Sequence, residues 1–133
     1  MEKITIIDNE FVTMWYYPDK KIIHHLFHQF LYGQAFRDTL NAGLDIFKKY
    51  DAHKWLSDDR HNAALPKEDV DWAQTNWFPR VMNAGWKFWA VVMPEQVIGQ
   101  MNMKRFVKNY SEQGLIVQVF GDAEAALTWL QSQ

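Results

Sequence analysis

The sequence predicts a single mixed α/β domain over residues 1–133. Three short β-branched or aromatic stretches follow one another near the N-terminus, with only turns between them. Helical and strand periodicities then alternate to the last residues. The length is that of one domain, and no linker, repeat or low-complexity tract interrupts it. The predicted order is β-β-β-α-β-α-β-α-β-α, which favours one mixed six-stranded sheet with right-handed crossovers.

The first three strands are expected to form an antiparallel meander. They span residues 3–7, 11–17 and 21–30, and turn-forming Asp, Asn and Pro residues separate them. Connections this short cannot cross over the sheet, so neighbouring strands must run in opposite directions.

The remainder of the chain predicts four main helices and three more strands. The helices cover residues 34–50, 66–84 and 96–110 and the segment capped by Asp122, and the strands cover 54–58, 86–93 and 115–120. Gly43 inside the first helix costs about 1 kcal/mol relative to Ala, which indicates close packing against a strand. Pro79 is expected to kink or split the second helix near Trp77.

Composition excludes several classes of function. The formal net charge of −2 gives no broad electrostatic footprint for nucleic acid. The absence of cysteine excludes disulfides, thiol catalysis and thiolate zinc sites. No apolar run approaches a membrane span, and the N-terminus does not resemble a signal peptide, so we expect a cytoplasmic protein. The 7 Trp, 9 Phe and 5 Tyr residues are unusual for this length, and large rings are enriched in cores and at interfaces.

One polar loop is a candidate ligand or interaction site. Asp58, Asp59, Arg60 and His61 follow a strand in the parallel part of the sheet, where ligands of α/β proteins tend to bind. Two carboxylates can hold a hard cation or act as acid and base. The alternative is structural, with one Asp capping the loop backbone and pairing with Arg60.

Three histidines close in sequence do not predict a metal site. On a strand, His24 and His28 share a face while His25 points to the other. Residues four apart on a strand lie about 13 Å from each other, too far for one ion. The sequence also has no P-loop, GxGxxG or GxSxG pattern. We therefore assign no catalytic residue, metal or cofactor.

Aromatic residues form the second candidate site. A pocket for an apolar or cationic ligand can be lined by Trp72 and Trp77 together with Trp86 and Trp89. The alternative for Trp77 and Trp89 is core packing between helix and sheet. Trp72 lies off the inward stripe of its helix, which is typical of an interface residue. Trp15 and Tyr17 belong to a strand with no polar face.

That aromatic strand surface predicts a partner. If the helices cover one face of the sheet, the other needs a second copy of the chain, a protein partner or an apolar ligand. We expect a homodimer that uses the aromatic surface of the meander, because self-association is the commonest solution.

Several segments resemble a family of small bacterial proteins grouped with the STAS and CRAL-TRIO-like superfamily. They are KWLSDDR at 54–60, EDVDWAQTNWFPRVMNAGWKFWAVVMP at 68–94 and VFGDAEAALTWL at 119–130. The resemblance implies a β-α superhelix with strands added in order and the main helices on one face. The superfamily includes anti-sigma-factor antagonists and lipid-transfer domains. The antagonists carry a phosphorylated Ser at a helix start, whereas Ser57 lies inside a predicted strand.

The leading interpretation is therefore a non-enzymatic, STAS-like regulatory or protein-interaction domain. The first alternative is a module that binds a small apolar ligand or lipid in an aromatic-lined pocket. The second alternative is an enzyme that uses the loop with Asp58, Asp59 and Arg60.

Overall fold

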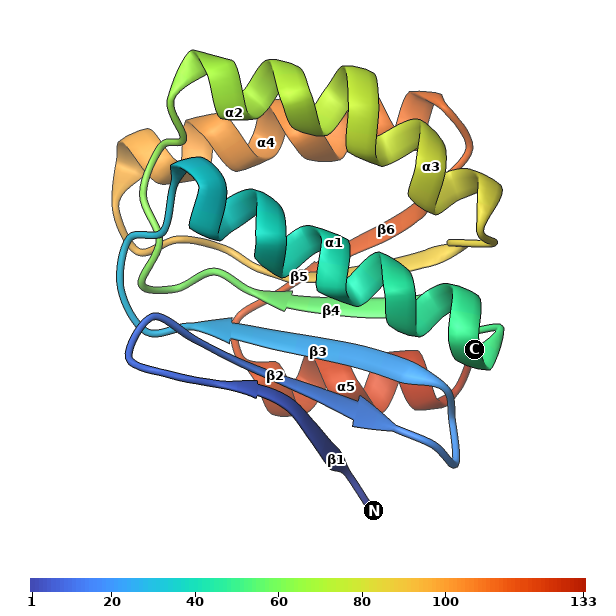
Figure 1. The fold of residues 1–133 in the computed structure, drawn as a ribbon. Coiled ribbons are helices and arrows are strands. Elements are labelled where there is room, and N and C mark those ends of the chain that lie inside the picture. The colour runs from blue at the N-terminus through green and yellow to red at the C-terminus, as the bar shows by residue number, and fades with distance from the viewer.

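A six-stranded mixed sheet forms the centre of the computed structural model, which describes residues 1–133 (Figure 1). The strands lie in chain order, and β1, β2 and β3 are antiparallel whereas β3 to β6 are parallel. This confirms the predicted fold class and strand order. The strands are β1 (Ile4–Asp8), β2 (Val12–Tyr17), β3 (Ile22–Phe27), β4 (Lys54–Asp58), β5 (Phe88–Val92) and β6 (Ile116–Phe120).

The third strand is shorter than the sequence predicts. Val12, the first residue of β2, pairs with Phe27, the last residue of β3. Before Val12 the chain turns, and the Asn9 side chain accepts hydrogen bonds from the backbone N–H groups of Phe11 and Val12. The His28 backbone N–H still donates to the Phe11 carbonyl oxygen at 2.8 Å, and residues 29 and 30 then leave the sheet.

The helical segments follow the predicted order. They are α1 (Gly33–Tyr50), α2 (Lys67–Trp72), η1 (Ala73–Trp77), α3 (Phe78–Asn83), α4 (Val97–Glu112) and α5 (Ala123–Gln131). The segment α2–η1–α3 is one helix with a π-helical turn, η1, just before Pro79. Proline removes a helical hydrogen bond and its ring clashes with the preceding turn, and a wider turn relieves both effects. No helix has the length and hydropathy needed to cross a membrane.

The helices lie on both faces of the sheet, and this corrects one expectation (Figure 1). The three crossover segments, α1, α2–α3 and α4, pack on one face because each joins neighbouring parallel strands with the same hand. Helix α5 follows the last strand, so no crossover fixes its side, and it packs beneath β4, β5 and β6. Ala126 and Leu130 of α5 are fully buried there with Leu56, Ala90 and Val92.

The position of α5 weakens the argument for a homodimer. Tyr17 belongs to the smaller hydrophobic core between α5 and the sheet and is only 6% exposed. Trp15 is half-buried on the same face, and the Lys3 ammonium lies 4.7 Å from its ring centroid. The aromatic surface expected to recruit a second copy is therefore largely covered by the chain itself.

Gly43 is the point of closest approach between α1 and the sheet. A Cβ atom at this position would lie 2.7 Å from Cζ3 and 2.9 Å from Cζ2 of Trp55, which is 1% exposed. The Trp55 ring thus lies directly against the backbone of α1. This confirms the close packing between helix and strand that Gly43 predicted. Phe47 and Trp77 pack edge-to-face against the ring, and its N–H donates to His25, so the ring cannot shift without breaking these contacts.

We predict that Gly43→Ala destabilises the protein by about 2 kcal/mol, because the cost of overpacking exceeds the gain of about 1 kcal/mol in helix propensity. Urea unfolding would measure the change. Gly121→Ala is the matched control, since its Cβ would meet nothing within 4 Å. Equal or greater stability of the Gly43 variant would contradict the close approach.

His24 is a buried polar residue on the second face of the sheet. Its Nδ1 lies 3.1 Å from the Tyr17 hydroxyl, while its Nε2 is buried without a hydrogen-bond partner. Burial lowers the pKa of His24 to about 4, and the nearby positive charges of Lys3 and Arg60 act in the same direction against Asp58. The folded protein therefore holds His24 neutral, whereas the unfolded chain protonates it more readily.

Stability should consequently fall as the pH drops from about 6.5 towards 4, because the unfolded chain binds the additional proton. Neutral His24 contributes about 3 kcal/mol to the free energy of unfolding. This contribution is fully present above pH 6.5 and is lost as the pH falls towards 4. Chemical unfolding between pH 4 and 7 would measure it. His24→Asn removes the titrating ring and should flatten this part of the profile. The same slope in both proteins would mean that His24 is not its source.

Candidate functional site

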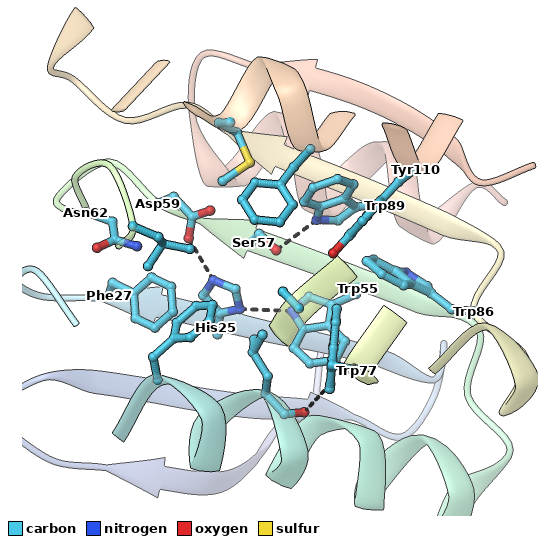
Figure 2. A pocket seen from close by; sticks show the side chains of 16 residues that line it. His25, Phe27, Trp55, Ser57, Asp59, Asn62, Trp77, Trp86, Trp89 and Tyr110 are labelled. Carbon is cyan, nitrogen blue, oxygen red and sulfur yellow. Dashed lines mark hydrogen bonds and ion pairs between the residues drawn. The ribbon is translucent and has the colours of Figure 1, made fainter. Parts of the chain in front are cut away.

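A cavity of about 60 Å³ lies between the sheet and the helices above it (Figure 2). Of its 16 lining residues, 12 are hydrophobic. Four of the seven tryptophans, Trp55, Trp77, Trp86 and Trp89, are among them. The cavity is thus an aromatic chamber inside the main core, with few polar groups.

Strand alternation brings the sheet residues of the chamber to one face. The parallel register places His25 of β3 beside Ser57 of β4, and Trp55 beside Trp89 of β5. Residues two apart on a strand point the same way, so all four side chains face the helices. Asp59 follows β4 directly and points to the same side.

The aromatic walls have a defined geometry. Trp86 packs edge-to-face with Trp89 and Trp77, with ring centroids 5.4 Å and 5.5 Å away. The indole N–H of Trp77 donates to the Leu40 carbonyl oxygen at 2.9 Å, and that of Trp86 to the Phe88 carbonyl at 3.0 Å. Each ring is therefore fixed both by contact and by a hydrogen bond.

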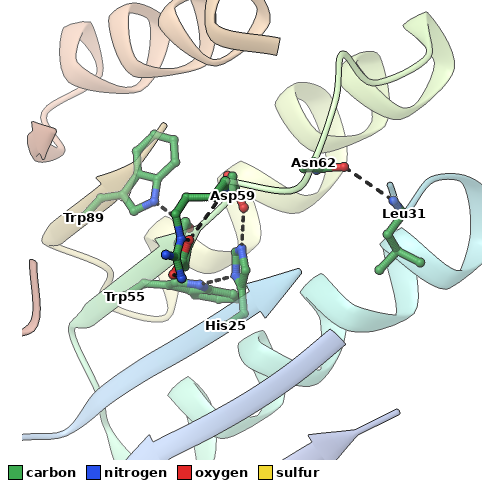
Figure 3. A network of polar contacts seen from close by, with 9 residues as sticks. His25, Leu31, Trp55, Asp59, Asn62 and Trp89 are labelled. Atoms are coloured by element: carbon green, nitrogen blue, oxygen red, sulfur yellow. Dashed lines mark hydrogen bonds and ion pairs between the residues drawn. The ribbon is translucent and has the colours of Figure 1, made fainter. Parts of the chain in front are cut away.

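A buried polar chain joins three lining residues (Figure 3). The Trp55 indole N–H donates to Nδ1 of His25 at 2.9 Å, and Nε2 of His25 lies 2.8 Å from Oδ1 of Asp59. An indole only donates, so Nδ1 must be an unprotonated acceptor. His25 is therefore neutral, with its proton on Nε2 donated to the Asp59 carboxylate. These two side chains are each only 4% exposed.

Two hydroxyl groups also line the chamber. The Ser57 oxygen accepts a hydrogen bond from the Trp89 indole at 2.8 Å. The Tyr110 hydroxyl is directed into the chamber, and no hydrogen bond connects it to the other lining side chains (Figure 2). Tyr110 is 2% exposed, and burial raises its pKa, so the hydroxyl is a neutral donor.

The opening of the chamber lies beyond the carboxyl ends of the parallel strands. Leu65, in the loop before α2, and Met103 of α4 are the lining residues that remain partly exposed. The Leu65 backbone N–H donates to Oδ1 of Asn102 at 3.2 Å, which ties this loop to α4. This is the position at which α/β sheets commonly bind ligands.

The structure separates the four residues of the candidate loop. Asp58 points away from the chamber and accepts two hydrogen bonds from the Arg60 guanidinium, each 2.9 Å long. Asp59 points into the chamber towards His25. His61 is exposed and does not line the chamber. The two carboxylates therefore do not act together, and Asp58 has the structural pairing with Arg60 considered from the sequence.

The aromatic candidates are also divided between different surroundings. Trp77 and Trp89 line the chamber as the pocket hypothesis requires. Trp72 lies outside it, edge-to-face with Phe36 and with the Arg37 guanidinium 5.5 Å from its ring centroid. Trp15 and Tyr17 are on the opposite face of the sheet and cannot reach the chamber.

Sequence reasoning missed the polar residues of the chamber. Strand alternation places His25 on the face opposite to His24, but the sequence alone does not show that this face lines a pocket. Ser57 enters the sequence analysis only because its position inside a strand does not match the phosphorylated Ser of the antagonists. No group of three or more His, Cys, Asp or Glu residues is positioned to hold a metal ion.

The fold and this chamber define an α/β domain with a buried aromatic pocket at the helical side of its sheet. Comparisons with protein-family models, with curated proteins and with solved structures found no match to the chain.

We predict that Trp55→Phe destabilises the protein by roughly 1–3 kcal/mol, because buried Nδ1 of His25 loses its donor. Urea unfolding would measure this loss, and Trp129→Phe on α5 serves as the control. In the unaltered protein, ¹⁵N spectra should show His25 protonated on Nε2 and not on Nδ1. A proton on Nδ1 would contradict the hydrogen-bond chain.

Proposed function

We propose that this chain is a non-enzymatic domain that binds a small, largely apolar molecule in the aromatic chamber. The observation that carries the proposal is a pocket with apolar walls into which the Tyr110 hydroxyl points without a hydrogen bond to the protein. Binding pockets commonly combine apolar walls with a few directed polar groups. The chamber of about 60 Å³ suits a small molecule or one end of a longer molecule that extends through the opening.

The polar chain favours binding over catalysis. Ser57, His25 and Asp59 are the residue types of a hydrolytic triad and line the same chamber. In such a triad, the imidazole must accept the proton of the serine hydroxyl. Here both imidazole nitrogens already have other partners, Trp55 on one side and Asp59 on the other. His25 is therefore not placed to activate Ser57.

The STAS-like assignment remains part of the proposal. The resemblance implies strands added in chain order, and the sheet order β1 to β6 agrees with that expectation. The small chamber argues against a full lipid cavity. A STAS-like regulatory domain that responds to a small ligand would account for both the family resemblance and the pocket.

A protein-interaction role is the second candidate, supported by the outer surface of α4. Val97, Ile98 and Met101 are 71%, 64% and 54% exposed, which makes them the most exposed large apolar residues on any helix. They lie on neighbouring helical positions and so form one patch. Exposed apolar patches of this kind are typical of contact surfaces. A partner or a second copy of the chain would bind here and not at Trp15 and Tyr17.

Native mass spectrometry of the purified protein tests the main proposal. We expect a non-covalently retained small molecule that is released on denaturation. Leu65→Trp places a larger ring at the opening and should reduce the retained fraction severalfold, since entry is blocked. Leu127→Trp on α5 is the matched control, because its position is also partly exposed but lies on the other face. Absence of bound mass, or equal retention by both variants, would count against the proposal.

A further inference from the structure

The Tyr110 hydroxyl faces the chamber and has no acceptor in the protein. It lies at the wall of the chamber, it forms no hydrogen bond to protein, and its residue is only 2% exposed (Figure 2). A hydroxyl hydrogen that has no acceptor in the protein can be donated to a molecule inside the chamber. An oxygen atom of a guest molecule could accept that hydrogen.

Ser57 offers a second donor in the same space. Its oxygen accepts the Trp89 indole N–H, which orients the side chain. The hydroxyl hydrogen itself has no acceptor among the lining side chains (Figure 2). A guest atom that accepts two hydrogen bonds, such as a carbonyl oxygen with its two lone pairs, matches two such donors.

The charge of the wall restricts the guest further. Asp59 is the only ionisable acid or base that lines the chamber besides His25 and Tyr110, and its carboxylate accepts the proton of His25. No Lys or Arg side chain lines the chamber. An anion would therefore lose its hydration without gaining a cation and would lie near a negative charge.

We propose that the chamber selects small neutral molecules with a carbonyl oxygen, and that the Tyr110 and Ser57 hydroxyls bind this oxygen. The selection rests on the proposed ligand-binding function and adds the chemical class of the ligand. The apolar groups on either side of the carbonyl would contact the tryptophan rings.

Three probe molecules of the same shape separate the contributions of hydrogen bonding and of charge to the binding affinity. Acetone, isobutene and acetate share the same planar, three-branched frame and differ in the group that faces the donors. Acetone presents a neutral carbonyl, isobutene presents a methylene group, and acetate presents a carboxylate. Differences in their affinity therefore report hydrogen bonding and charge and not size.

The indole N–H signals of the protein provide the measurement. In ¹H–¹⁵N spectra, Trp89 and Trp86 report the chamber, whereas Trp15, Trp72 and Trp129 lie outside it and serve as internal references. We expect acetone to shift the chamber signals at lower concentration than isobutene, and acetate to leave them unchanged. The reference signals should stay in place with all three probes.

Tyr110→Phe removes only the hydroxyl. It should weaken acetone binding by about fivefold or more, the equivalent of one hydrogen bond, and leave isobutene binding unchanged. Tyr50→Phe, at a residue that stacks on Tyr16 outside the chamber, is the matched control and should change neither. The comparison of the three probes on the unaltered protein needs no variant and stands if a variant fails to fold.

The possible outcomes are distinguishable. If isobutene binds as tightly as acetone and Tyr110→Phe changes nothing, the carbonyl selection is wrong while ligand binding stands. If acetate binds best, the charge argument is wrong. If no probe moves the chamber signals and no ligand is retained on purification, the proposed function fails together with the selection.

Discussion

Two interactions of the Trp55 side chain determine the packing of α1 on the sheet and the arrangement of the polar groups in the chamber. Its ring lies against the bare backbone of Gly43, and its N–H donates to His25. One contact sets the distance between α1 and the sheet. The other fixes the tautomer of His25 and, through it, the orientation of the Asp59 carboxylate. A single indole therefore connects the packing of the core with the polar groups of the chamber.

The chamber results from filling a core with large planar rings. Trp77 comes from the π-helical turn, Trp89 from β5 and Tyr110 from α4, so three separate elements contribute to one wall. Edge-to-face rings with bonded N–H groups have little freedom to rotate into a remaining gap. Smaller aliphatic side chains could close such a space by changing rotamer. The aromatic content that stands out in the sequence thus explains why a space persists in a well-packed domain.

Much of the fold could be predicted from local patterns, because hydrophobic period and turn residues are local properties. The interruption before Pro79 and the close approach at Gly43 were both foreseen on this basis. The side on which α5 packs was not, because no crossover constrains a helix after the last strand. This one element decides whether Tyr17 is an exposed surface or a core residue.

The candidate site was predicted only in part, for a similar reason. Trp77 and Trp89 were identified because their own elements place them inward. The pairing of His25 with Asp59 joins residues 34 positions apart, and only the register between β3 and β4 brings them together. The divergence of Asp58 and Asp59 follows from the alternation of side chains along an extended chain.

The close-packed indoles also give the molecule an optical property. Trp55, Trp77 and Trp86 lie with ring centroids between 5.4 Å and 5.9 Å of one another. At such separations, in a fixed chiral arrangement, the electronic transitions of neighbouring rings couple and are shared among them. The circular dichroism of this protein in the ultraviolet therefore carries an exciton signal from the wall itself, which responds to small rotations of the rings without any added label.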